Sequence, residues 1–319
     1  MTLKSSSVRL VRRTSAVVGV AAISLLVAGS ARAGHPTRVA ASLPAAPSVS
    51  DSPAVELLSL DSLTGLSGKL RARFIPTDIA PTVPLIAELF GDSAVRRAGV
   101  YAVDSARAAQ PFAFITMRPF AEKKNGRIGT YRMGNWPFER RSAVRDAYAN
   151  PQGFIEVTAE NQDTYVSEHF RLRDFLTKDQ HAVWPKYLVL DARLLDKLEL
   201  VIAELSRSGV PVRHVSVMSG FRTPQYNQKG VGAGGRAQTS RHQYGDAADV
   251  FVDNDRNGRL DDLNKDGRIN TRDVAVMVAA VERVERTYPE LIGGAGTYKA
   301  TSSHGPFVHI DARGNRARW

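Results

Sequence analysis

The chain of 319 residues contains no cysteine. This absence excludes a disulfide framework and a thiolate metal site, so any bound metal must be held by histidine, carboxylate, amide or backbone oxygen. The apolar run 16–28 is shorter than the roughly 20 residues of a spanning helix, and no run of spanning length follows it. With 43% hydrophobic and 24% charged residues, the composition excludes a wholly disordered chain and a polytopic membrane protein.

The first 33 residues have the pattern of an export signal. Four basic side chains precede the apolar run 16–28, and Ala31-Arg32-Ala33 then supplies a small-x-small cleavage motif. A buried N-terminal helix would explain neither the charge order nor the cleavage motif. We therefore expect a periplasmic or extracellular protein without a transmembrane segment once the signal is removed. Arg12-Arg13 hints at twin-arginine export, which Thr14-Ser15 fits poorly.

Three segments follow the signal. Residues 34–54 are rich in Ala, Pro and Ser, and we expect them to form a flexible linker. Residues 55–150 contain strand-like runs at 112–118 and 127–133, on either side of an Asn125-Gly126 dipeptide that favours a hairpin turn. We expect a small β-rich domain there, to which we assign no chemistry, and a separate domain over 151–319.

The hydrophobic pattern after residue 151 predicts an α+β domain. Apolar residues recur with helical spacing over 191–206 and 271–288, and Gly209 follows the first of these helices as a stop signal. The expected strands cover 214–219, 247–252 and 306–311, and a Gly-rich loop covers 228–239. The two helices and three strands are the frame on which the chemistry of the chain is expected to sit.

Three side chains of this domain are candidates for one metal site. His242 precedes a turn at Gly245 and Asp249 lies in the strand that follows, so both can point at one spot. His309 lies in the last expected strand, on the same face as Asp311, because side chains alternate along a strand. Two histidines and one aspartate are a normal ligand set for catalytic zinc. The alternative is that His242 caps a turn and His309 packs within its strand.

The spacing Ser-x-His-x-x-Gly-x-Ala-x-Asp over 240–249, followed by a histidine in a later strand, resembles the zinc D-Ala-D-Ala carboxypeptidase family. That family includes L-alanyl-D-glutamate endopeptidases and shares its fold with the hedgehog signalling domain. The segment Ser-Gly-Phe-Arg-Thr-Pro at 219–224 and the closing His-Ile-Asp-Ala-Arg-Gly…Arg-Trp at 309–319 strengthen the resemblance, which covers about 170–319. It implies an α+β domain whose antiparallel sheet carries the ligands.

The resemblance also assigns roles to individual residues. It makes His242, Asp249 and His309 the zinc ligands. Arg222 matches an arginine that meets a substrate carboxylate or carbonyl oxygen, where the alternative is a surface ion pair. Ser240 matches a serine that contacts the substrate, where the alternative is a turn cap.

One position departs from the family pattern. Many members carry Glu or Asp three residues before the last zinc histidine as the general base, and this chain has Pro306 there. His304 is one replacement, because some endopeptidases of this fold carry a histidine five residues before the ligand, and histidine suits proton transfer near neutral pH. Asp311 is another, although it could instead orient a zinc-bound histidine. His304 could also be a solvated loop residue.

The segment 253–273 predicts calcium binding. Residues 262–273 fit a twelve-residue loop with oxygen ligands at alternate positions and Gly267 at the turn. The candidate ligands of this loop are Asp262, Asn264, Asp266, the carbonyl of Arg268, Asn270 and Asp273. Those of a second, overlapping loop are Asp253, Asp255 and Asn257. The segment resembles the dockerin form of the EF-hand loop, and a solvated acidic turn is the alternative.

These observations predict an exported, zinc-dependent peptidase that cleaves the peptide stems of peptidoglycan. The resemblance leaves open whether the cleavage is of the carboxypeptidase or the endopeptidase type. The alternative is a non-catalytic cell-wall-binding module that keeps the fold and the metal, which Pro306 favours. The formal charge of +11 suits an anionic environment but does not indicate nucleic acid as a partner.

Overall fold

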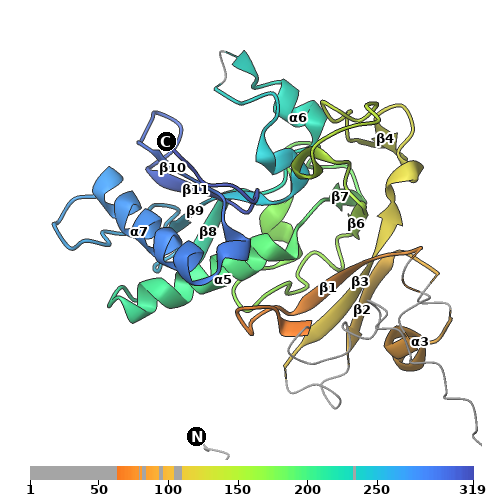
Figure 1. Ribbon diagram of the computed structural model, residues 1–319, viewed down its shortest axis with the longest axis horizontal. Helices are drawn as coiled ribbons and strands as arrows, with labels where there is room; N and C mark the ends of the chain where they lie inside the picture. Colours follow the sequence, from red (N-terminus) through yellow and green to blue (C-terminus); the bar gives the residue numbers. More distant parts are fainter. Residues whose placement is uncertain (1–62, 79, 81–83, 93–95, 104–109, 233–234) are drawn as a thin grey trace, which may run out of the picture. The chain divides into compact units, whose positions relative to one another are not determined.

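The computed structural model describes residues 63–78, 80, 84–92, 96–103, 110–232 and 235–319 (Figure 1). These residues all fall in one unit of the chain, Ser50–Trp319. The expected export signal (1–33) and linker (34–54) lie outside the described residues. No helix among the described residues is long and apolar enough to cross a membrane.

A five-stranded sheet forms the centre of the C-terminal half. Its order is β12-β10-β11-β9-β8, and its neighbours are antiparallel except for the parallel pair β10 and β12. The strands are β8 (Val215–Ser219), β9 (Ala247–Val252), β10 (Gly294–Tyr298), β11 (Phe307–Asp311) and β12 (Ala317–Arg318). The sheet and its helices confirm the predicted α+β class.

Two long helices cover this sheet. The first, α5 (Ala192–Arg207), is capped by Asp191 and buries the predicted apolar face that begins at Leu194. The second, α7 (Thr271–Thr287), contacts α5, β10 and β11, so the two helices pack together beside the sheet (Figure 1). Their apolar faces are buried because each helix repeats its hydrophobic residues with a helical period.

A second sheet begins the described chain and crosses residue 150. Its order is β1-β3-β6-β7, with β2 paired to β3. The strands are β1 (Ala72–Pro76), β2 (Gly99–Val103), β3 (Phe112–Pro119), β6 (Gly153–Val157) and β7 (Lys186–Leu188), and α3 (Pro84–Phe90) precedes β2. One buried apolar cluster extends from Leu70 to Ile310. The domain boundary expected at 150 therefore falls inside a sheet and a continuous core.

The Asn125-Gly126 turn forms, but it does not join the two expected strands. Both residues have positive φ, 51° and 71°, as a tight hairpin turn requires. The residues on either side of them, Lys124 and Arg127, exchange backbone hydrogen bonds of 2.8 and 2.9 Å. After the turn, β4 (Arg127–Ile128) pairs with β5 (Tyr131–Arg132), whereas β3 ends at Pro119 and pairs with β1, β2 and β6. Turn chemistry is local, but the choice of strand partner depends on the rest of the fold.

The remaining elements are short. One is the helix α6 (Pro224–Gln228), and the others are 3₁₀ turns. The turns are η2 (Phe120–Glu122), η3 (Asp146–Tyr148), η4 (Leu172–Phe175), η6 (Arg241–Tyr244) and η7 (Pro289–Leu291). Two of them, η3 and η6, lie beside the site described next.

Candidate active site

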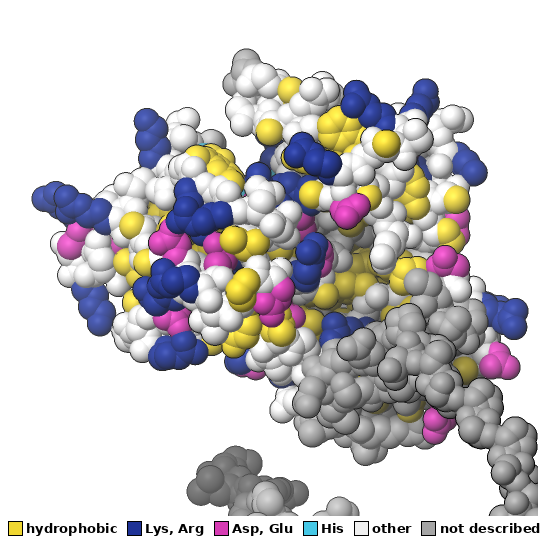
Figure 2. Space-filling view, in the orientation of Figure 1, with side chains coloured by type: hydrophobic (Ala, Val, Ile, Leu, Met, Phe, Trp, Pro, Cys, Tyr) yellow, Lys and Arg dark blue, Asp and Glu magenta, His cyan; other side chains and the backbone are white. Residues whose placement is uncertain are grey.

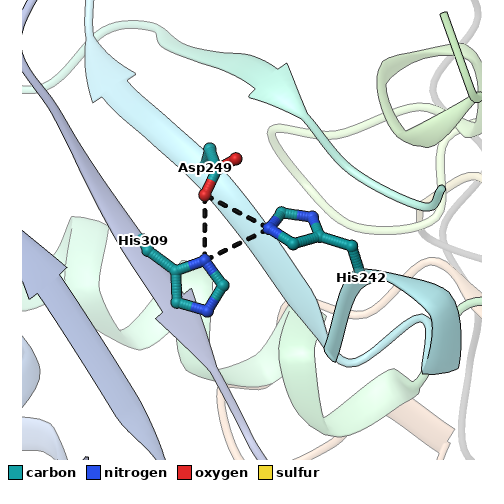
Figure 3. Close-up of side chains that lie close together, drawn as sticks. All are labelled: His242, Asp249 and His309. Atoms are coloured by element: carbon teal, nitrogen blue, oxygen red, sulfur yellow. Dashed lines mark hydrogen bonds and ion pairs between the residues drawn. The ribbon is translucent and has the colours of Figure 1, made fainter. Parts of the chain in front are cut away.

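His242, Asp249 and His309 meet on one face of the C-terminal sheet (Figure 3). Asp249 in β9 and His309 in β11 are directly opposite in the antiparallel ladder, so their side chains share a face. His242 comes from η6, which ends at Gly245 with a φ of 72°. A Cβ at position 245 would overlap the carbonyl of Val189, so the turn that brings His242 to the sheet needs glycine.

The donor atoms of these three side chains form a small triangle. Asp249 Oδ1 lies 2.9 Å from His309 Nδ1 and 3.2 Å from His242 Nε2, and the two nitrogens are 3.2 Å apart. Zinc bonds of 2.0–2.1 Å in a tetrahedron place neighbouring ligand atoms about 3.3 Å apart. The triangle and its two-histidine, one-carboxylate composition therefore fit one zinc ion.

Both imidazoles are held by a second hydrogen bond on their other nitrogen. His242 Nδ1 lies 2.7 Å from the carbonyl of Gly220, which fixes the ring so that Nε2 faces the triangle. His309 Nε2 lies 3.1 Å from Asp311 Oδ2. Such outer partners fix the orientation and basicity of metal-binding histidines. Each ring therefore presents one nitrogen to the same point.

Asp311 contacts the nitrogen of His309 that faces away from the triangle. It is fully buried, and its oxygens accept hydrogen bonds from Arg313 Nε at 2.9 and 3.0 Å and from the Gly294 N–H at 2.8 Å. Burial raises the pKa of Asp311, but the hydrogen bonds from His309 and Arg313 outweigh it and hold the pKa well below its usual range. This buried position suits a group that orients His309 better than one that transfers a proton to a substrate.

Arg222 is tied to the same triangle. Its Nη2 donates to Asp249 Oδ2 at 2.9 Å, and its Nε donates to Ser219 Oγ at 2.9 Å. The bond from Nη2 occupies the oxygen of Asp249 that does not face the histidines. The third nitrogen, Nη1, donates to no described residue, so Arg222 retains a donor for a substrate oxygen beside the candidate metal position.

A pocket of about 630 Å³ opens onto the triangle. Ser240, His304 and Arg222 all line it together with the candidate ligands. Ser240 precedes η6, and its hydroxyl does not cap that turn, which leaves it available to a substrate. The predicted site residues of the zinc domain other than Asp311 thus share one pocket.

His304 occupies the loop between β10 and β11. Its ring packs edge-on against Phe307 with centroids 5.1 Å apart, and its Nδ1 lies 2.8 Å from the carbonyl of Gly305. Pro306, which stands where many family members carry Glu or Asp, is buried. Among the expected bases, His304 is therefore the one with access to the pocket.

Two residues of the pocket, Tyr148 and Trp319, have no role predicted from the sequence. Tyr148 comes from the region to which we assigned no chemistry, and its ring packs 5.5 Å from that of Tyr244 beside η6. Trp319 lies with its ring centroid 5.2 Å from that of His309 and donates from Nε1 to the Tyr298 hydroxyl at 2.9 Å. The closing Arg-Trp motif was a signal for Trp319, whereas no local pattern marks Tyr148.

The acidic segment forms two successive turns of the same kind. The carboxylates of Asp253 and Asp262 each accept hydrogen bonds of 2.8–3.2 Å from the backbone N–H groups four and five residues later. Each turn passes through a glycine with positive φ, 79° at Gly258 and 80° at Gly267. The carboxylates of Asp253, Asp255 and Asp261 converge within 4.8 Å. Exposed acidic groups commonly gather in this way without an ion, so calcium stays a prediction.

Several predicted calcium ligands have other partners. Asp273 is fully buried, and its oxygens accept from the backbone N–H groups of residues 263, 264 and 270. It forms a capping box with Asn270 at the start of α7. Asn257, Asn264, Asp266 and Arg268 make hydrogen bonds within the turns. The last residue of the motif thus caps a helix, at the position where we predicted a twelfth calcium ligand.

Among the comparisons with known proteins, the family comparison covers part of this site. A comparison with curated proteins gives no match. The solved structure of the L-Ala D-Glu endopeptidase ChiX from Serratia marcescens is 25% identical, with coverage of 39% of this chain and 82% of that chain and a TM-score of 0.26. Residues 180–277 match the family described as Peptidase M15, and this stretch holds Arg222, Ser240, His242 and Asp249. Residues 180–277 are therefore similar to the peptidase M15 family.

Proposed function

We propose that this protein is an exported, zinc-dependent peptidase that cleaves the peptide stems of peptidoglycan. Three features support the proposal: the family of residues 180–277, the triangle of His242, Asp249 and His309, and the pocket beside it. The triangle carries the argument, because its three buried nitrogen and oxygen atoms, 2.9–3.2 Å apart, match the ligand types and spacing of a tetrahedral zinc site. The predicted export signal at 1–33 supports a place outside the cytoplasm.

The residues of the chain divide the chemistry among them. Zinc, when bound, supplies a Lewis acid and a water nucleophile near neutral pH. Arg222 holds the substrate carbonyl or carboxylate oxygen through its free Nη1. Asp311 keeps His309 in the tautomer that presents Nδ1. His304, at the pocket, takes a proton from the nucleophile and returns it to the leaving amine.

The proposal is tested with purified protein, zinc and soluble muropeptides, followed by mass spectrometry. We expect cleavage of stem peptides, and we expect His309→Ala to abolish it. The competing function is a binding module that keeps the fold and the metal, and the proline at position 306 favours it. That module would bind zinc and stems without releasing any product, so intact stems after prolonged incubation with the zinc-loaded protein would establish it.

A further inference from the structure

The pocket has a strong excess of positive charge. Its lining includes five basic side chains and a single carboxylate: Lys178, Arg222, Arg236, Arg241, Arg313 and Asp249. Three of the five are ion-paired with buried aspartates. Lys178 and Arg236 form no ion pair with a described residue. An excess of this kind favours an anionic ligand, because unpaired cations in a concave site attract negative charge.

Arg236 differs from Lys178 because its neighbours hold it in place. Its guanidinium lies 4.3 Å from the ring centroid of Tyr226, and its Nη1 donates to the Tyr226 carbonyl at 2.6 Å. A Cβ at Gly230 would overlap this side chain, so the loop backbone packs directly against it. Arg236 is thus fixed without an acidic partner, and such a guanidinium loses little conformational freedom when it binds an anion.

Arg236 and Arg222 face the same pocket. Burial lowers the pKa of Arg222, and the positive charge of Arg236 adds to this effect while the charge of Asp249 opposes it. The two guanidinium groups are therefore close enough to repel each other. Arg236 makes no described bond through Nε or Nη2, and Arg222 makes none through Nη1. One anion placed between the two guanidinium groups would offset their repulsion and accept hydrogen bonds from their free N–H groups.

We propose that Arg236 and Arg222 together bind a carboxylate of the substrate, so that Arg236 makes the enzyme selective for stems with a free carboxylate near the cleaved bond. This inference rests on the proposed function, which supplies the stem as substrate. Arg236 belongs to the 228–239 loop, outside the ligand motif that begins at Ser240. It is a specificity-determining residue, and it takes no part in proton transfer.

The test uses one tetrapeptide stem in three forms: with all carboxylates free, with the D-glutamate α-carboxylate amidated, and with the terminal D-alanine amidated. Binding to the metal-free full-length protein is measured by calorimetry, and cleavage by the zinc protein is measured in parallel. We expect the free acid to bind about 10–100-fold more tightly than one of the two amides, the range for hydrogen bonds to charged groups. Arg236→Gln should lower that preference to the part that Arg222 alone supports, and Arg236→Lys should keep more of it.

Lys229→Gln is the matched control. Lys229 is a cation on the same loop, 6.0 Å from the same Tyr226 ring, but it does not line the pocket. The control should keep the full preference, which separates the pocket contact from a loss of net charge. An undiminished preference in Arg236→Gln, or the absence of any preference in the wild type, overturns the inference. Carboxylate-selective binding without cleavage would overturn the proposed function alone, and cleavage indifferent to amidation would overturn this inference alone.

Discussion

The buried contact between His309 and Asp311 decides how firmly the candidate metal is held. The carboxylate orients the imidazole at 3.1 Å and is itself fixed by Arg313. Asp311→Asn should therefore lower zinc affinity by about 10–100-fold, because the amide weakens the orienting bond without emptying the space. Competition with a zinc chelator measures the affinity. An unchanged affinity would mean that Asp311 only supports the fold.

His304 is expected to act on protons and not on the metal. His304→Ala should keep bound zinc and lose roughly 10²–10⁴-fold in turnover, the usual contribution of a positioned acid or base. Ser302→Ala changes the same exposed loop outside the pocket lining and serves as the control. Steady-state cleavage of stem peptides gives the rates. Full turnover in the His304 variant would show that His304 is a solvated loop side chain without a catalytic role.

The sequence predicts some site residues better than others. Asp249 follows His242 by seven positions, with a turn between them, so their convergence can be predicted from local structure. Tyr148 and Arg236 cannot be found in the same way. Tyr148 reaches the pocket because Arg241, beside His242, bonds to the carbonyl of Ala147 and stacks on the Tyr148 ring. Such contacts depend on tertiary packing, which no local pattern encodes.

At the scale of elements, hydrophobic periodicity predicts structure where one face is buried. The strand expected over 247–252 is β9, and the helix expected over 271–288 ends one residue earlier, as α7. The hairpin at Asn125-Gly126 shows the limit of this approach. The glycine and asparagine specify the turn, but the partner of β3 is set by a non-local pairing with β1 and β6.

The contact between α5 and the chain before η4 predicts a pH dependence of stability. His169 Nδ1 lies 2.7 Å from Glu199 Oε2, and Glu199 is fully buried on α5. This hydrogen bond raises the pKa of His169, although burial opposes it. A raised pKa means that the stabilisation is fully present below the unfolded value, near pH 6.5, and is lost as the pH rises through the folded value.

Urea unfolding of the wild type and of His169→Gln at pH 6 and pH 8.5 measures this effect. We expect the variant to be less stable at pH 6 by about 1.5–3 kcal/mol, the range for a hydrogen bond to a charged group. The difference should shrink at pH 8.5, because the wild-type imidazole is then neutral. A difference that grows with pH would contradict the assignment of a protonated His169.

The described part of the chain between 63 and 319 behaves as one structural unit. Trp136 Nε1 donates to the carbonyl of Gln243 at 2.8 Å, next to the candidate ligand His242. The strand β6 pairs with both β3 and β7, on either side of residue 150. On the face shown in Figure 2, Lys and Arg side chains are spread among Asp and Glu side chains over the described residues. The pocket, in contrast, has five basic side chains and one carboxylate in its lining.

Truncation of the chain tests whether its two halves fold as one unit. A fragment of residues 151–319 would lack the β3 partner of β6 and the Trp136 contact, so an edge strand and much of the common core would be exposed. We expect the fragment to unfold without a cooperative transition, in contrast to the full chain. Circular dichroism during thermal unfolding reports the difference. A cooperative transition in the fragment would show that 151–319 is an independent domain, as the sequence alone suggests.

The most direct test of the central claim is the zinc content of the purified protein, measured by mass spectrometry of the metal for the wild type and for His309→Ala. The geometry of His242, Asp249 and His309 predicts one zinc ion per wild-type chain. Loss of one ligand should abolish stoichiometric binding, because two ligands rarely hold zinc in a catalytic geometry. Equal zinc content in the two proteins, or a wild type that binds no zinc, would contradict the account.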